Sequence, residues 1–133
     1  MMNKISSNNI TSLNKNEIFV FGSNESGIHG AGAAKCALKW GAIYGKPFGL
    51  QSNTFAIPTK GILLKTLNIS TIYSYINKFI EFAKEHPELK FLVTEIGCGL
   101  AGFDPSDIAP LFKECLNVDN IYLPVRFVDL IRG

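Results

Sequence analysis

Two glycine-rich segments carry the residues whose types and spacing could bind an anion. The first runs from residue 22 to residue 32, and the second from 97 to 102. Because glycine has no side chain, backbone N–H groups in such segments can approach a phosphate or diphosphate closely. A tight turn that needs glycine for its own geometry would explain either segment alone equally well. Since each segment lies between an expected strand and an expected helix, we expect their amides to converge on one anionic ligand.

Three side chains could take part in chemistry: Cys98 and His29 within these segments, and Lys60 at the end of a separate expected strand. Lys60 ends an apolar stretch, and three roles are open to it: a nucleophile that forms a Schiff base, a partner for a ligand phosphate, or a solvated surface lysine. Cys98 stands between two glycines, but no nucleophile-elbow spacing surrounds it, so we do not expect it to act as a nucleophile. His29 stands among small residues, and we interpret it as a polar loop residue.

The spacing of the cysteines argues against a metal site. The chain has three cysteines, far apart, which match neither a metal-binding pattern nor a disulfide framework. Cys36 and Cys115 fall on the faces of expected helices, so we predict that both are small core residues. The glycine spacing is not that of a dinucleotide-binding fingerprint, and no P-loop Lys-Ser/Thr pair follows it. We therefore predict no metal and no cofactor.

Short apolar strands alternate with amphipathic helices around the two glycine loops. Asp104 is the expected N-cap of a helix whose pattern Pro110 interrupts, so either residues 105–108 form a separate turn or the helix bends at Pro110. Strands alternating with helices indicate the α/β class, with a three-layer α/β/α sandwich around a mixed central sheet. The expected strands are 17–21, 54–58, 91–96 and 120–124, and the other expected helices are 33–40 and 70–86.

Length and charge limit the classes of function. The 133 residues fit a single domain at 16–133, preceded by a loose arm at 1–15 that is rich in serine and asparagine. The net charge is only +2 without a block of lysine and arginine, so we expect no nucleic-acid partner. No apolar run approaches the length of a membrane span, and we expect no membrane partner and a cytoplasmic location.

Four short segments carry a resemblance to a known family. Ser23-Asn24 followed by the cluster at 30–34 resembles the first loop of macrodomains, and residues 96–102 closely resemble the diphosphate loop of one macrodomain branch. That branch removes ADP-ribose from glutamate side chains. Residues 55–60 resemble the strand that ends in the branch's catalytic lysine. With Ile121 to Pro124, the pattern also resembles a family of small phage-encoded macro-like proteins.

The resemblance implies a macrodomain-like sandwich that binds ADP-ribose. It places Lys60 at the catalytic position and Asn24 at the position that contacts the distal ribose. The glutamate-reversing branch carries an Asp directly after Gly-Cys-Gly-Leu, where this chain has Ala101, so the resemblance does not extend to a hydrolytic carboxylate. The implied ligand-binding residues are Ser23, Asn24, Gly30, Gly32, Gly97, Cys98, Gly99, Leu100, Ala101, Gly102 and Phe103.

Two classes of function follow from these observations. In the first, the chain binds ADP-ribose or a related NAD-derived nucleotide through its two glycine loops, with weak or absent ADP-ribosyl hydrolase activity. Its partners would be that nucleotide or an ADP-ribosylated protein. In the second, the macro-like domain is a protein-interaction module with no nucleotide in its cleft. The two bare loops favour the first class, because an interaction surface has no need of clustered amides.

Overall fold

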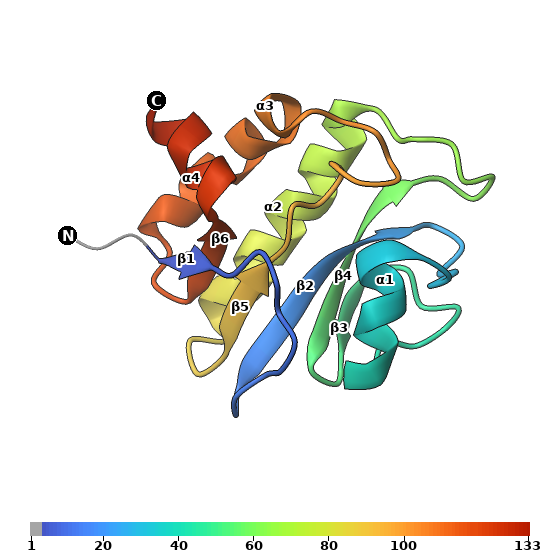
Figure 1. The fold of residues 1–133 in the computed structure, drawn as a ribbon, viewed down its shortest axis with the longest axis horizontal. Helices are drawn as coiled ribbons and strands as arrows, with labels where there is room; N and C mark the ends of the chain where they lie inside the picture. Colours follow the sequence, from blue (N-terminus) through green and yellow to red (C-terminus); the bar gives the residue numbers. More distant parts are fainter. Residues whose placement is uncertain (1–3) are drawn as a thin grey trace.

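The computed structural model describes residues 4–133, which form a six-stranded sheet between two layers of helices (Figure 1). The predicted α/β sandwich with a mixed sheet is therefore confirmed. No helix among these residues is long and apolar enough to cross a membrane. The strands are β1 (Ile5–Ser6), β2 (Glu17–Asn24), β3 (Gly49–Gln51), β4 (Thr54–Lys60), β5 (Lys90–Val93) and β6 (Ile121–Pro124). The helices are α1 (Gly32–Ala37), α2 (Ile69–Glu85), α3 (Pro105–Ile108) and α4 (Val125–Arg132), with 3-10 helices η1 (Leu38–Trp40) and η2 (Ala109–Asn117).

The order of strands in the sheet is β1-β6-β5-β2-β4-β3. All neighbouring strands are parallel except β3, which runs antiparallel to β4. From β2 the chain reaches β4 on one side, and it then crosses over to β5 on the other side. The strand order therefore reverses between β2 and β5, and such a switch point is where open α/β sheets bind ligands, at the carboxyl ends of their strands.

The loose arm that we predicted at 1–15 is in part paired with the sheet, and its first three residues lie outside the described part of the chain. Ile5 and Ser6 form the edge strand β1, which pairs with β6 through Leu123 and Pro124. The Ser6 hydroxyl is buried and donates a hydrogen bond of 2.6 Å to the carbonyl oxygen of Val93. The unpaired backbone N–H and C=O groups at the edge of a sheet gain hydrogen-bond partners when another extended segment pairs with them. This gain explains why residues 5 and 6 form a strand beside β6.

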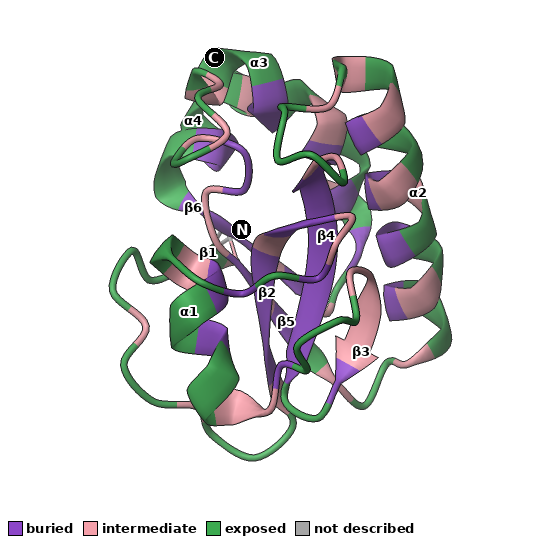
Figure 2. Cartoon of the chain, turned by 90° about the vertical axis from the view of Figure 1, so that its right-hand side faces the viewer, coloured by how far each residue is buried: buried purple, intermediate pink, exposed green. Residues whose placement is uncertain are grey.

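Both faces of the central strands are buried, as a parallel sheet requires. Along β2, Ile18 and Val20 join the larger core under α2, η2 and α4, whereas Phe19 and Phe21 join the smaller core under α1. This alternation follows from the two-residue period of a strand. Figure 2 shows β2, β4 and β5 as a purple, buried layer between α1 and α2. The strands that carry the glycine loops are thus packed on both faces.

Helix α2 and the cap of α3 confirm two local predictions. The helix predicted at 70–86 spans Ile69–Glu85, and the Asn68 side chain accepts a hydrogen bond from the backbone N–H of Thr71. The side chain of Asp104 accepts from the backbone N–H of Ser106 and forms a capping box with Asp107. Helix α3 ends at Ile108, so residues 105–108 form a separate turn. A proline removes a helical hydrogen bond, and Pro110 accordingly lies in the 3-10 helix η2.

Other boundaries and burial predictions were wrong. β2 and β4 each extend beyond the predicted strand, to Asn24 and Lys60, whereas β5 ends at Val93. β3 and α4 were not expected from the sequence. Cys115 is buried as predicted, but Cys36, on the short helix α1, is exposed.

Candidate functional site

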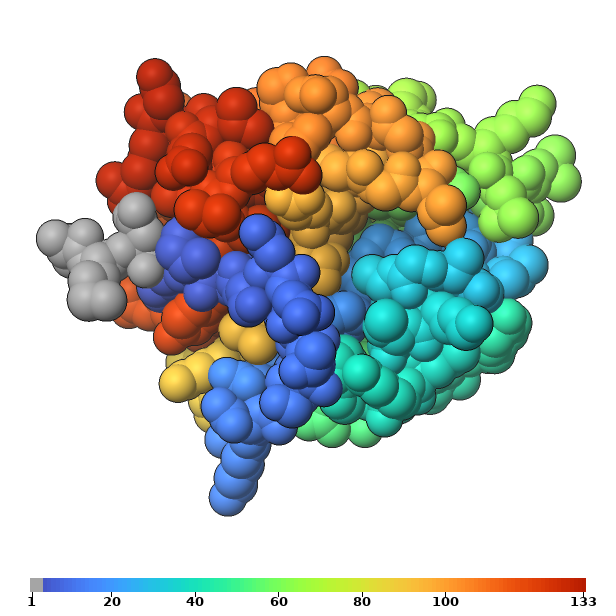
Figure 3. Space-filling view, in the orientation of Figure 1, coloured from blue at the N-terminus to red at the C-terminus, as the bar shows by residue number. Residues whose placement is uncertain are grey.

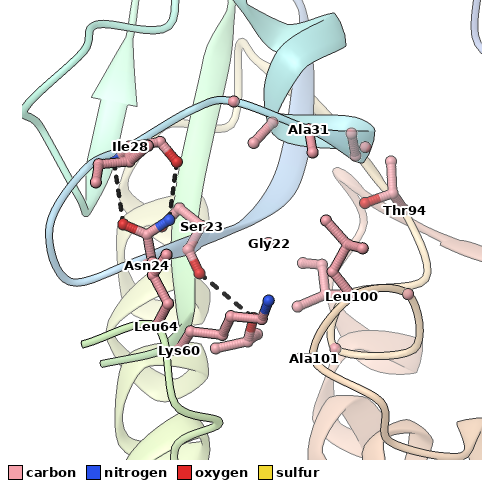
Figure 4. Close-up of a pocket in the computed structure, with 18 of the residues that line it drawn as sticks. Gly22, Ser23, Asn24, Ile28, Ala31, Lys60, Leu64, Thr94, Leu100 and Ala101 are labelled. Atoms are coloured by element: carbon pink, nitrogen blue, oxygen red, sulfur yellow. Dashed lines mark hydrogen bonds between the residues drawn. The ribbon is translucent and has the colours of Figure 1, made fainter. Parts of the chain in front are cut away.

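The two glycine loops lie next to each other at the switch point of the sheet. The first loop (residues 25–31) follows β2 and leads into α1, and the second loop (residues 94–103) follows β5 and leads into α3. β2 and β5 are hydrogen-bonded neighbours, with Val20 paired to Val93. Because both strands are parallel, both loops leave the sheet at the same edge. Figure 4 shows the cleft that they enclose, with Gly22 at its centre and Lys60 reaching in from β4.

This cleft has a volume of about 410 Å³, within the range of small-molecule sites. Nine of the twelve residues predicted from the sequence line it, and three do not. The nine are Ser23, Asn24, Gly30, Gly32, Lys60, Gly97, Gly99, Leu100 and Ala101.

The second loop offers a row of backbone amides without protein partners. The N–H groups of Gly99, Leu100 and Ala101 donate to no other group among residues 4–133. The following amide, that of Gly102, closes a turn by donating 3.0 Å to the carbonyl oxygen of Gly99. Unpaired N–H groups on successive residues form a concave site of positive partial charge. The loop can therefore hold an anion without using any side chain.

The first loop presents a second row of amides on the opposite wall. The N–H groups of Gly30, Ala31 and Gly32 have no hydrogen-bond acceptor in the described part of the chain. Ala31, the residue before α1, provides no side-chain cap. The two loops approach each other at their tips, since a Cβ on Gly32 would lie 3.8 Å from the Leu100 side chain. Leu100 thus reaches across the cleft from the second loop to the first.

The polar side chains of the first loop hold the loop itself. The Asn24 amide accepts from the backbone N–H of Ile28 at 3.0 Å and donates to the Ile28 carbonyl at 2.8 Å (Figure 4). The Ser23 hydroxyl donates 2.5 Å to the carbonyl of Pro47. Both side chains are buried. Asn24 therefore holds the first loop in place. Its predicted contact with a ribose has to use the second amide N–H or the second lone pair of the amide oxygen, which Ile28 does not occupy.

Lys60 is the cationic side chain of the cleft. It is half-buried at the end of β4, and Figure 4 shows its ammonium group in the space between Ser23 and Ala101. Among residues 4–133, it makes no ion pair with a carboxylate. A lysine in this position adds a positive charge to the floor between the two rows of amides.

The described part of the cleft wall holds one carboxylate, Glu95, and it is already paired. Arg126 from α4 donates to both of its oxygens, at 2.8 and 2.6 Å, and these hydrogen bonds lower the pKa of the Glu95 carboxyl below its usual value. Asp104 is exposed and accepts hydrogen bonds from Ser106, which lower its pKa. Because hydrogen-bond donors engage both carboxylates and their lowered pKa values make them weaker bases, neither is suited to activate a water beside Lys60.

Cys98, Gly102 and Phe103 are the three predicted ligand-binding residues that do not line the cleft. The Cys98 thiol is half-buried, 3.5 Å from the carbonyl of Ile96, and burial together with the charge of Glu95 raises its pKa to about 11. Phe103 packs against the main core beneath Gly97. The side chains of Cys98 and Phe103 pack against the core, and the backbone of the second loop faces the cleft.

His29 is buried, contrary to its interpretation as a polar loop residue. Its ring has no exposed surface, lies edge-on to Phe21, and places Nε2 2.9 Å from the carbonyl oxygen of Ile43. That carbonyl can only accept, so Nε2 carries the proton. Nδ1 has no partner among the described residues. His29 therefore fixes the first loop to the segment after η1 and does not line the cleft.

Several cleft residues were missed because they lie on strands or directly after them. Gly22 forms the floor, where a Cβ would lie 3.5 Å from Thr59 and 3.6 Å from Ile96. Thr94 and Glu95 follow β5 and line the side nearest α4. Their position at the carboxyl end of a parallel strand is the signal that could have identified them, since ligands bind at that edge of an α/β sheet.

A second cavity of about 510 Å³ adjoins the cleft. The two share Ala33, Thr94 and Glu95 as a common wall. The second cavity carries neutral polar groups from the N-terminal segment, and the paired side chains of Glu95 and Arg126 cancel each other's charge. The remaining residues that line it are Ser7, Asn8, Asn9, Ile10, Phe19, Cys36 and Pro124.

Comparisons with known proteins add a fold but no function. No family model and no curated sequence matches the chain. A solved structure of a protein of unknown function from Bacteroides thetaiotaomicron is similar, with a TM-score of 0.63 and 15% identity over 86% of this chain and 88% of that chain. At this identity the likeness shows the fold alone, and the resemblance to macrodomains stays a prediction.

Proposed function

We propose that the cleft binds ADP-ribose or a related NAD-derived nucleotide, with its diphosphate between the two glycine loops. The observation that carries this proposal is the pair of unpartnered amide rows, at 30–32 and 99–101, on facing walls of one cleft. Backbone N–H groups that lack partners are strong donors to phosphate oxygens. Lys60 adds a full positive charge between them, and the one carboxylate on the described walls is neutralised by Arg126.

The adjoining cavity supports a ligand that has two parts. A diphosphate and one sugar fit the scale of the 410 Å³ cleft, and the neighbouring 510 Å³ leaves room for a base with its ribose. The neutral amides of Asn8 and Asn9 and the apolar Phe19 are suited to an uncharged heterocycle rather than to a further phosphate. We therefore place the nucleoside half of the ligand in the second cavity.

The same geometry favours a binding protein over an efficient hydrolase. Lys60 could attack the anomeric carbon of an ester-linked ADP-ribose, with the released carboxylate as the leaving group. Hydrolysis of the resulting adduct would need a general base, and Glu95 and Asp104 are both engaged by other groups. Ala101, whose carbonyl is held by the Thr66 hydroxyl at 2.8 Å, contributes no carboxylate. We accordingly propose binding with weak or absent turnover, in a cytoplasmic setting.

Thermal denaturation with a series of nucleotides tests the binding proposal. ADP-ribose at a hundredfold excess over its Kd should raise the melting temperature by about 10 °C, because a ligand of the folded state stabilises it by mass action. AMP should give a smaller shift, since it brings one phosphate to a site with two amide rows. Equal shifts with AMP and ADP-ribose would contradict the diphosphate assignment, and no shift with any nucleotide would favour an interaction module.

A turnover assay tests the enzymatic part separately. The measurement is release of labelled ADP-ribose from an automodified protein by the wild-type chain, Lys60→Ala and Ala101→Asp. We expect no multiple turnover by the wild type and a gain in Ala101→Asp, which places a carboxylate on the cleft wall. Robust multiple-turnover release by the wild type, lost in Lys60→Ala, would show that the chain is an enzyme and that another group acts as the base.

A further inference from the structure

Glu95 stands where the cleft meets the adjoining cavity. It lines both spaces, whereas Arg126, its partner on α4, lines only the adjoining cavity. In the proposed arrangement the diphosphate lies in the cleft and the base in the adjoining cavity, so the nucleoside ribose that joins them crosses the wall between the two. The other residues of that wall, Ala33 and Thr94, are uncharged. Glu95 is therefore the charged group that a ribose meets when it passes from one space to the other.

Hydrogen bonds fix the Glu95 carboxylate in position. Its side chain is 24% exposed, and Arg126 donates to both of its oxygens, at 2.8 and 2.6 Å. The backbone on either side is also tied down. The Thr94 hydroxyl donates 2.8 Å to the carbonyl of Val20, and the N–H of Cys98 donates 3.2 Å to the carbonyl of Glu95. Each carboxylate oxygen has a second lone pair, so the group can still accept a hydrogen bond from a ribose hydroxyl.

Carboxylates offset the positive charge of Arg126. Its hydrogen bonds to Glu95, together with the charges of Glu95 and Asp104, raise the pKa of the guanidinium above its usual value. Glu95 and Arg126 are the charged residues among those that line the adjoining cavity, so this lining has no net positive charge for a further phosphate. A phosphate on the ribose would instead approach the Glu95 carboxylate, and like charges repel at close range.

We propose that Glu95 makes the site specific for nucleotides whose nucleoside ribose carries a free 2′-hydroxyl, and so for NAD-derived rather than NADP-derived ligands. This inference rests on the proposed nucleotide binding. In dinucleotide sites of other α/β folds, an acidic residue accepts from the 2′-hydroxyl and an arginine accommodates a 2′-phosphate. Here Arg126 is a positioning residue, because it holds the carboxylate. Figure 3 shows this face, with the blue N-terminal segment beside the red α4 and across a hollow from the cyan α1.

Calorimetry with three nucleotides tests this specificity on the full chain. They are ADP-ribose, ADP-ribose 2′-phosphate, and an ADP-ribose that lacks the 2′-hydroxyl of its nucleoside ribose. The wild type should bind the 2′-phosphate at least about tenfold more weakly than ADP-ribose, because the added phosphate meets a like charge. It should bind the deoxy form about tenfold more weakly, because a hydrogen bond to an ionised group is lost.

Substitutions at the ion pair should change this preference in opposite directions. Glu95→Gln keeps the shape of the side chain but removes its charge, which frees Arg126 to bind a phosphate. This variant should bind the 2′-phosphate at least about tenfold more tightly than the wild type does, and ADP-ribose no more tightly. Arg126→Gln, at a side chain that is 61% exposed, leaves the carboxylate uncompensated and should reject the 2′-phosphate more strongly. Thermal melting of each free variant checks that it is folded.

A matched control and the order of affinities separate this proposal from the nucleotide site itself. Glu85→Gln removes the same charge from the exposed last residue of α2, which lines neither space, and should keep the wild-type preference. If the wild type binds ADP-ribose and its 2′-phosphate equally, or prefers the 2′-phosphate, or if Glu95→Gln retains the full preference, the specificity proposal is overturned and the nucleotide site stands. If the wild type binds none of the three nucleotides, both proposals are overturned.

Discussion

Replacement of Gly99 by valine is the most direct test of the amide site. Gly99 lines the cleft, and its φ lies outside the left-handed region that favours glycine. A Cβ built on it would meet no other heavy atom within 4 Å. The folded chain therefore has room for a valine here, whereas the same change at Gly102, with φ of +85°, would strain the backbone. The valine side chain would occupy the space in which a phosphate must approach the amides of 99–101.

The expected loss of affinity follows from the hydrogen bonds that the valine would block. A hydrogen bond to an ionised group contributes about 1.5–3 kcal/mol. If the side chain prevents one or two of the three amides at 99–101 from reaching the phosphate, binding weakens by about 3 kcal/mol, which is roughly a hundredfold in Kd. The stability of the unliganded protein should change little, because no packed group moves and the valine restricts the unfolded chain.

Isothermal calorimetry with ADP-ribose, combined with thermal melting of the free protein, measures both quantities. Ser12→Val is a matched control, because Ser12 is exposed and lines neither the cleft nor the adjoining cavity. It should bind ADP-ribose like the wild type. If Gly99→Val melts normally and keeps full affinity, the second loop does not hold the diphosphate through its backbone, and the proposed diphosphate site is refuted.

Three further predictions concern single side chains. Lys60→Ala should keep ADP-ribose affinity within about tenfold by calorimetry, because a partly solvated ion pair contributes about 1 kcal/mol; a thousandfold loss would show that the lysine dominates binding. At pH 8, iodoacetamide should modify the exposed Cys36 well before Cys98, since a thiol with a pKa of about 11 is almost fully protonated there; peptide mass spectrometry would reveal the opposite order. Asn68→Ala removes the acceptor for the N–H of Thr71 at the start of α2 and should lower the melting temperature by about 4 °C, for a loss of about 1 kcal/mol; an unchanged melting temperature would rule out a stabilising cap.

The elements with strong local signals were predictable from the sequence. α2 shows a clear helical period, and Asp104 precedes a proline at the first helical position, so both were placed to within a residue or two. β3 and β1 are short strands whose pairing depends on a neighbour far away in the chain, and α4 directly follows a strand that ends in Pro124. Such elements are set by tertiary contacts more than by propensity, which is why local patterns did not reveal them.

The candidate site was predictable as a pair of loops but not side chain by side chain. Strand–loop–helix repeated twice was enough to infer that both loops face one cleft, since parallel strands present their carboxyl ends at one edge. The direction in which each side chain points could not be predicted from the sequence in the same way. Cys98 and Phe103 sit in the glycine loop but point into the core, and His29 is buried because Phe21 and Ile43 surround its ring. These orientations depend on packing from elements that are distant in sequence.

Side chains and backbone have different roles in the cleft, which explains why few residue types in its sequence motif point to a ligand. The polar side chains around it are used to hold the loops: Ser23 binds Pro47, Asn24 binds Ile28, and Thr66 binds the carbonyl of Ala101. In the proposed nucleotide site, recognition of the ligand falls to backbone amides, which every residue type except proline provides. Such a site tolerates changes of side chain as long as the backbone keeps its path and no bulk enters the cleft. We therefore expect binding to depend most on the glycines that leave the amides accessible. The polar side chains contribute indirectly, because they fix the path of the loop backbone.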